Sequence, residues 1–268
     1  NSEADLTLSG TTPNASFGYS VSSAGDVNGD EYDDVIVGEP GTSKAYIFYG
    51  GVSMNNVADV VLTGEVAGDF FGGSVSLAGD VNGDGYDDVI VGDLGYNIGI
   101  GRAYIFYGDA NMNSISDVIM TGEAIEDYFG NPVSSAGDVN GDGYSDVIVG
   151  AAGYVQGLGR AYIYFGGASM NNTADVTITI GVTGDIPSVS ASSAGDVNGD
   201  GYSDVIIGDF QYSASIGRAS IYLGGVAMNN IADVTMTGEA TSNEFGYSVS
   251  EAGDVNDDGY DDVIVGAR

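Results

Sequence analysis

Residues 80–88 read DVNGDGYDD, and near-copies of this nonamer return at residues 26–34, 138–146, 196–204 and 254–262. Oxygen-bearing side chains stand at loop positions 1, 3, 5 and 9, and position 6 is glycine in four of the five copies. Glycine lets the backbone turn sharply without a Cβ clash. Three carboxylates, an Asn amide, the position-7 carbonyl and water would supply the six to eight oxygen ligands that calcium takes. The nonamers therefore predict five calcium loops.

Each loop offers the same candidate ligands, namely the side chains at positions 1, 3, 5 and 9 and the backbone carbonyl at position 7. These sets are Asp26, Asn28, Asp30, Tyr32 and Asp34; Asp80, Asn82, Asp84, Tyr86 and Asp88; Asp138, Asn140, Asp142, Tyr144 and Asp146; Asp196, Asn198, Asp200, Tyr202 and Asp204; and Asp254, Asn256, Asp258, Tyr260 and Asp262. An EF-hand needs a bidentate Glu at position 12, but Val or Ile stands there in all five copies. The position-9 aspartate is expected to close each cage instead, so up to five Ca²⁺ ions are expected.

Hairpin turns without metal are the alternative interpretation of these loops. Asn-Gly pairs at 28/29, 82/83, 140/141 and 198/199 are a strong hairpin signal, and aspartate favours turns in any case. However, carboxylates in one turn repel each other, by roughly 4 kcal/mol for a pair about 4 Å apart at an effective dielectric constant of about 20. A bound cation explains three carboxylates in one loop better than a metal-free turn does. Glu31 at position 6 and Asp257 at position 4 replace glycine, and the first loop is expected to be strained and weaker.

Acidic residues dominate the charge of the chain. The formal net charge is −34, and 20 of the 39 Asp and Glu residues lie inside the five nonamers, so much of the acidity belongs to the predicted sites. Adaptation to a high-salt habitat is an alternative source of the remainder. Phosphate binding needs clustered Lys and Arg, and the chain has five such residues in all. Nucleic acid is therefore excluded as a partner.

The chain contains no Cys and no His. Disulfides, Cys nucleophiles, Ser-His-Asp triads and His-bound zinc are excluded as a result. A carboxylate-pair glycosidase is formally possible, but every acid pair that can be placed already belongs to a predicted cage, so no enzyme activity is expected. There is no apolar run of about twenty residues, so no membrane span is predicted. Calcium loops of this type are most useful where calcium is millimolar, which favours an extracellular or cell-surface location.

The spacing of the nonamers defines a repeat. Their first aspartates are 54, 58, 58 and 58 residues apart, and a period of this size with about four strands is typical of a propeller or a similar array. In the second unit, strands are expected at 71–76, 88–92, 103–108 and 117–122, with segments between them too short for helices. The sequence thus predicts an all-β, β-propeller-like array of five four-stranded blades within a single domain of residues 1–268.

The two ends of the chain are expected to differ from the repeat. Residues 1–10 match residues 55–64, so the chain is expected to start on a fourth strand, and it stops just after the second strand of the fifth unit. The last blade is therefore predicted to be incomplete, with one third strand missing. The segment could be a window from a longer propeller, the N-terminal strand could close the last blade imperfectly, or a neighbouring molecule could add a strand and build a fibre.

Four features recur in order along the units: a Phe-Gly pair in four of the five, an Ala-Gly-Asp entry, the acidic cage, and a Val-Ile-Val-Gly or Val-Ile-Ile-Gly exit such as residues 89–92. In this the chain resembles the FG-GAP repeat family, the blade type of integrin α-subunit propellers, over essentially its whole length. Phe-Gly stands at 17/18, 71/72, 129/130 and 245/246, whereas Pro187 and Ser188 replace it in the fourth unit. The resemblance implies a propeller, usually of seven blades, with structural calcium in some blades and partners bound elsewhere, often on the opposite face.

Other recurrent side chains have less certain roles. Arg102, Arg160, Arg218 and Lys44 precede third strands and are expected to cap a hairpin and offset local negative charge, although pairing with loop carboxylates or a ligand is an alternative. The position-7 tyrosine rings are expected to pack between blades, with stacking on carbohydrate as the alternative. The connections 93–101, 151–159 and 209–217 diverge most between units, so specificity for a partner is expected there.

These observations favour a calcium-binding, non-enzymatic extracellular propeller that serves cell-surface adhesion or protein–protein interaction. Its partner would be a protein or glycan at the cell surface, or copies of itself. The first alternative is a subunit of an extracellular filament or sheath assembled by strand complementation. The second alternative is a carbohydrate-binding propeller.

Overall fold

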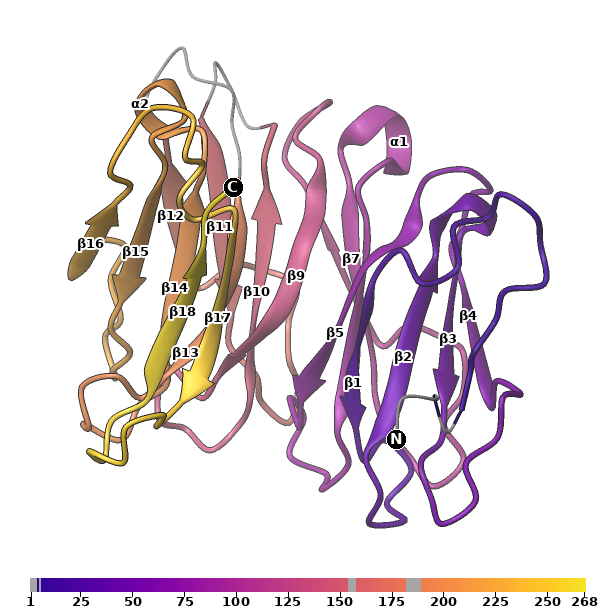
Figure 1. The fold of residues 1–268 in the computed structure, drawn as a ribbon. Coiled ribbons are helices and arrows are strands. Elements are labelled where there is room, and N and C mark those ends of the chain that lie inside the picture. The colour runs from indigo at the N-terminus through magenta and orange to yellow at the C-terminus, as the bar shows by residue number, and fades with distance from the viewer. Residues whose placement is uncertain (1–3, 5, 154–157, 182–188) are drawn as a thin grey trace.

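The computed structural model describes residues 4, 6–153, 158–181 and 189–268, and this part of the chain is all-β (Figure 1). Its strands form four antiparallel sheets of four strands and one sheet of two strands. Every sheet is a meander in which strands that are consecutive in sequence are neighbours. The prediction of four-stranded units that repeat along the chain is confirmed.

The sheets have the following bounds. The first contains β1 (Val21–Gly25), β2 (Asp34–Glu39), β3 (Lys44–Phe48) and β4 (Val60–Thr63), with η1 (Pro40–Thr42) after β2. The second contains β5 (Phe71–Gly79), β6 (Asp88–Asp93), β7 (Arg102–Phe106) and β8 (Val118–Thr121), with α1 (Tyr96–Gly99) after β6. The third contains β9 (Phe129–Gly137), β10 (Asp146–Ala151), β11 (Gly159–Tyr164) and β12 (Val176–Ile180). The fourth contains β13 (Ser190–Gly195), β14 (Asp204–Asp209), β15 (Arg218–Tyr222) and β16 (Val234–Thr237), with α2 (Tyr212–Ser215) after β14. The fifth contains β17 (Ser248–Gly253) and β18 (Asp262–Gly266).

The sheets follow one another in chain order, and the first strand of each sheet packs against the first strand of the next. β1 packs against β5, β5 against β9, β9 against β13, and β13 against β17. In Figure 1 the array runs from the indigo first sheet on the right to the yellow fifth sheet on the left. This arrangement is consistent with propeller blades, whose inner strands line the centre. In the described part of the chain no strand of the first sheet pairs with one of the last.

The hydrophobic core lies between successive sheets rather than inside any one of them. The Val-Ile-Val run of β6 is buried on both faces: Val89 and Val91 pack with the first sheet, and Ile90 packs with the third. Because side chains alternate along a strand, one strand contributes to two interfaces. An isolated sheet would expose both faces, so each blade depends on its neighbours.

Glycines bring adjacent sheets into backbone contact. A Cβ placed on Gly92 in β6 would lie 1.8 Å from the carbonyl oxygen of Gly130 in β9, and Gly130 itself has φ +95°. The same approach joins Gly38 to Gly72 and Gly208 to Gly246. In these three pairs, the glycine of the Val-Ile-Val-Gly or Val-Ile-Ile-Gly exit of one sheet therefore contacts the glycine of the Phe-Gly pair of the next sheet. The substitution at Pro187 and Ser188 lies outside the described residues.

The ends of the array differ partly from the sequence-based prediction. The described residues 6–10 form no strand, so the prediction of a fourth strand at residues 1–10 is wrong for them. A strand there would need a third strand of a preceding sheet as its partner, and none stands beside it among the described strands. The fifth sheet holds two strands, as the predicted lack of a third strand requires. Its residues are more exposed, with Ile264 at 62%.

Replacing Gly92 by Ala tests the backbone contact between sheets. The added methyl would meet a carbonyl oxygen that cannot rotate away, so we expect a loss of about 1–3 kcal/mol in the free energy of unfolding, measured by urea denaturation. Gly266→Ala is the matched control, since it occupies the same motif position in the fifth sheet and its nearest neighbour would be the movable Ser248 Oγ. Equal losses in the two variants would contradict the explanation.

Candidate metal-binding loops

The five acidic nonamers connect the first and second strands of each sheet, as the sequence predicts. In the loop between β5 and β6, the Asp80 carboxylate accepts hydrogen bonds from the backbone N–H groups of positions 4, 5 and 6 at 2.6, 3.1 and 2.9 Å. The Asn82 amide oxygen and the Asp84 carboxylate each accept one from the residue two positions on, at 2.8 and 3.0 Å. Positions 1, 3 and 5 thus curl the backbone around their own oxygens.

The position-9 aspartates of the first four loops are buried, and they tie the loop to the sheet. Asp88 is fully buried, and its two carboxylate oxygens accept hydrogen bonds from Val81 N at 2.9 Å and from Gly108 N at 2.8 Å. Val81 lies in the loop and Gly108 follows β7, so one carboxylate fixes both. Asp34, Asp146 and Asp204 make the equivalent pairs of bonds in their sheets. For Asp262 in the fifth sheet, the bond from Val255 N remains at 3.0 Å.

Burial gives the loop carboxylates unequal acidities. Desolvation, with a smaller contribution from the neighbouring position-5 and position-1 carboxylates, outweighs the two backbone hydrogen bonds and raises the pKa of Asp88 and Asp146 to about 7 and that of Asp34 to about 6. On the exposed rim, backbone N–H groups, first that of Gly259, lower the pKa of Asp254. The first four loops therefore combine a buried carboxylate that ionises at a cost with rim carboxylates beside it. A cation would offset that cost.

The structure brings the predicted ligands of each loop into one turn without closing them into a cage. Asp80 and Asp84 are near enough to Asp88 to raise its pKa. Across the described ranges, however, no three His, Cys, Asp or Glu side chains are gathered closely enough to hold a metal ion as they stand. The donor set fits a hard cation in chemistry and number. Calcium ligation by the residues of positions 1, 3, 5, 7 and 9 stays a prediction.

Neighbouring loops contact each other through residues whose role sequence reasoning missed. The Asp87 side chain at position 8 accepts a hydrogen bond from Asp26 N at 2.9 Å, and Asp87 N donates to the Asp26 carbonyl at 3.2 Å. Asp261 and Asp196 repeat both bonds between the fifth and fourth sheets. Position 8 is Asp or Ser in every loop, and that recurrence of small polar residues was the available signal.

Four of the five position-7 tyrosine rings pack against the neighbouring blade, as predicted, whereas Tyr32 in the first loop is exposed. A Cβ on Gly29 would lie 2.6 Å from Tyr86 Cε1, because the ring rests on the position-4 glycine of the preceding loop. The same contact joins Tyr144 to Gly83, Tyr202 to Gly141, and Tyr260 to Gly199. Position 4 is therefore glycine where a following tyrosine covers it. Asp257 stands at that position in the last loop, where the structure places no further tyrosine.

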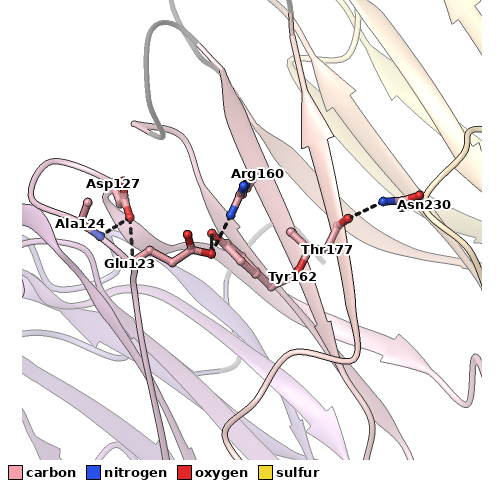
Figure 2. A network of polar contacts seen from close by, with 7 residues as sticks. All are labelled: Glu123, Ala124, Asp127, Arg160, Tyr162, Thr177 and Asn230. Carbon is pink, nitrogen blue, oxygen red and sulfur yellow. Dashed lines mark hydrogen bonds and ion pairs between the residues drawn. The ribbon is translucent and has the colours of Figure 1, made fainter.

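The arginines that precede third strands lie at the other end of the sheets, since β6, β10 and β14 each separate them from an acidic loop. Arg102 pairs with Glu65 at 2.8 Å, Arg160 with Glu123 at 2.6 Å, and Arg218 with Asp209 at 3.2 Å. Figure 2 shows that Glu123 also accepts the Tyr162 hydroxyl, at 3.1 Å. These pairs offset local negative charge as expected. Glu65 and Glu123 come from connections at this end and Asp209 from the end of β14, so none of the three carboxylates belongs to an acidic loop.

Comparisons with known proteins agree with this geometry. The FG-GAP repeat model matches residues 130–164 and 188–222, and an FG-GAP-like repeat model matches residues 26–91. Integrin alpha-5 of Xenopus laevis is 33% identical over 262 residues, which are 94% of this chain and 20% of that protein. Integrin alpha-6 of Gallus gallus is 35% identical over 102 residues, 37% of this chain and 9% of that protein. Integrin alpha-8 of Mus musculus is 32% identical over 126 residues, which are 42% of this chain and 12% of that protein.

The chain belongs to the FG-GAP repeat family and is a distant homologue of the integrin alpha subunits. The family is generally non-catalytic. The chain spans about a fifth or less of the length of the relatives named above. Neither helix of the described residues is long and apolar enough to cross a membrane.

The raised pKa values of the buried position-9 aspartates predict how the metal-free protein responds to pH. Between the unfolded pKa near 3.8 and the folded pKa near 7, the folded state of Asp88 binds the proton and the unfolded state releases it. Stability should therefore fall as pH rises from 5 to 8. We expect the melting temperature in chelator to drop over this range, and to drop less in Asp88→Asn. An identical slope in the variant and the wild type would contradict the assignment.

Proposed function

We propose that the five acidic loops bind calcium and that the chain is a non-enzymatic binding module at the cell surface or outside the cell. The observation that carries the proposal is the buried position-9 aspartate next to two further carboxylates in the first four loops, typified by Asp88. FG-GAP repeats commonly bind Ca²⁺, and integrin homology suggests an extracellular or surface location.

Calcium in these loops would stabilise the array and not only the turn that holds it. Asp26 and Asp87 exchange hydrogen bonds between successive loops, and Tyr86 rests on Gly29, so an ion that fixes one loop also fixes the surface its neighbour packs on. When the free calcium concentration is one hundred times the dissociation constant of a site, that site adds about 2.7 kcal/mol to the free energy of unfolding. Five such sites would add about 13 kcal/mol. That equals the whole stability of a typical domain.

Partner binding would use the end of the sheets opposite the acidic loops. The connections after β6 and β14 lie there, and connections of this kind diverge most between units. Variable connections held on a rigid scaffold are the usual place for recognition. Integrin homology suggests protein partners, so adhesion or another protein–protein interaction is the function that we favour.

Strand complementation is an alternative proposal, in which a strand from another molecule would pair with a sheet edge of this chain. The glycan alternative has less support, because the rings of Tyr86, Tyr144 and Tyr202 lie against loop glycines. Electron microscopy of the purified chain would distinguish filaments from isolated particles.

The calcium proposal predicts a large effect of chelation. We expect EDTA to lower the melting temperature strongly and excess calcium to restore it. Asp80→Asn should reduce the number of bound calcium ions by one, measured by isothermal titration calorimetry, because it weakens a rim ligand of the second loop. Glu239→Gln is the control of equal charge, since Glu239 is exposed and lies outside the loops. An unchanged melting temperature in EDTA would refute calcium as a structural ligand.

A further inference from the structure

The fourth strands β4, β8, β12 and β16 form one edge of each four-stranded sheet, since in the described part of the chain each pairs with a third strand on one side only. In the first sheet the Ile47 carbonyl accepts a hydrogen bond from Asp59 N at 2.9 Å, so the backbone groups of Ile47 point toward β4. These directions alternate along an antiparallel pair. The N–H and C=O groups of Val61, which lies opposite Tyr46, therefore point away from β3 and toward the free edge.

Two of these edges are covered by an asparagine from the following sheet. The connection after β11 reaches back to β8, where Asn172 Nδ2 donates a hydrogen bond to the Ile119 carbonyl at 3.2 Å. The connection after β15 does the same to β12, where Asn230 Nδ2 donates to the Thr177 carbonyl at 3.1 Å (Figure 2). Ile119 and Thr177 stand in register where Val61 stands in the first sheet. A loop laid over an edge strand is one way in which proteins prevent a further strand from pairing there.

The edge of β4 lacks this cover because the asparagine is replaced. In both covered edges the asparagine lies 53 residues after the carbonyl that it binds, and at the same distance after Val61 the chain has Ser114. The hydroxyl of serine sits one carbon closer to the backbone than the amide nitrogen of asparagine. Ser114 is exposed, and among the described residues its hydroxyl makes no hydrogen bond to the Val61 carbonyl. The connection after β7 is therefore not tied to the strand that it adjoins.

The residues of β4 themselves suit pairing with a further strand. The strand reads VVLT, and the β-branched residues among these favour the extended conformation. It contains no proline and no charged side chain, which are the residues that edge strands use against pairing. β8 and β12 are also short, uncharged and free of proline. The missing asparagine, and not the composition of the strand, therefore distinguishes β4 from them.

The charge of the chain selects among the strands that could pair with this edge. The formal net charge is −34, with five basic residues in all. Four of those five are engaged in ion pairs, namely Arg102, Arg160, Arg218 and Arg268. A second copy of the chain would bring the same negative charge to the edge and would be repelled, whereas a strand with Lys or Arg beside it would be attracted. Charge complementarity thus favours a basic segment of a different protein.

We propose that β4 is a docking edge for an extended, basic segment of a partner protein, which adds to the first sheet as a further strand. The outward N–H and C=O groups of Val61 and of Thr63, two residues further on, would form the new hydrogen bonds. The inference rests on the proposal that the chain is a binding module, and it gives the strand-pairing alternative a defined edge. It does not require the acidic loops to bind calcium.

Isothermal titration calorimetry of the full chain at saturating calcium tests this proposal. The probe is a peptide of alternating Val and Thr with two Lys at each end. Ser114→Asn restores the asparagine over β4 and should bind one peptide fewer than the wild type. Asn172→Ser and Asn230→Ser uncover β8 and β12, and each should bind one peptide more. Differences from the wild type are compared because no following connection adjoins β16 in the described residues, so that edge can also take a peptide.

The same peptide methylated on alternate backbone nitrogens is the control for attraction by charge alone, since it keeps the lysines and loses backbone donors. It should not bind. Equal binding of the methylated peptide, or an equal number of peptides on Ser114→Asn and the wild type, would overturn the proposal. Absence of binding to the wild type would overturn it as well. None of these results bears on calcium binding by the loops, which Asp80→Asn measures separately, or on partner binding by the variable connections.

Discussion

Adjacent sheets of this protein meet backbone to backbone, and the rest of the structure depends on that approach. Gly92 faces the carbonyl of Gly130 at a distance that leaves no room for a side chain. The same closeness lets the ring of Tyr86 rest on Gly29 and lets the Asp87 carboxylate reach the backbone of Asp26. The recurrent motifs of the repeat therefore serve the contacts between sheets, with glycine at these places where the backbones of two sheets approach each other.

The acidic residues of the loops have a structural role in this packing. Asp88 closes its loop and holds Gly108 beside β6, so it cannot be replaced by an apolar residue without freeing two backbone N–H groups. Its burial makes ionisation costly, and its acidic neighbours increase that cost. A divalent cation, as we propose, would relieve both effects at once, at the surface where the next loop packs.

The repeat architecture was predictable because its signals are local and recur. The Phe-Gly pair, the acidic nonamer and the Val-Ile-Val-Gly run each appear at a fixed place in a unit, so the order of strands followed directly. Residues 6–10 were mispredicted because their match to residues 55–64 says nothing of the partner strand that they need. The pairing of Arg102 with Glu65 was also out of reach, since Glu65 lies in the preceding repeat unit and the two residues meet only when the sheets pack.

The two ends of the sheets carry different chemistry, with recurrent acidic loops at one and variable connections at the other. The central claim is that the loops are calcium sites that hold the sheets together. Crystals grown with excess calcium test this most directly through the anomalous signal of the ion. The account predicts calcium density in each loop within coordination distance of the side chains at positions 1, 3, 5 and 9. Water alone in all five loops would contradict it.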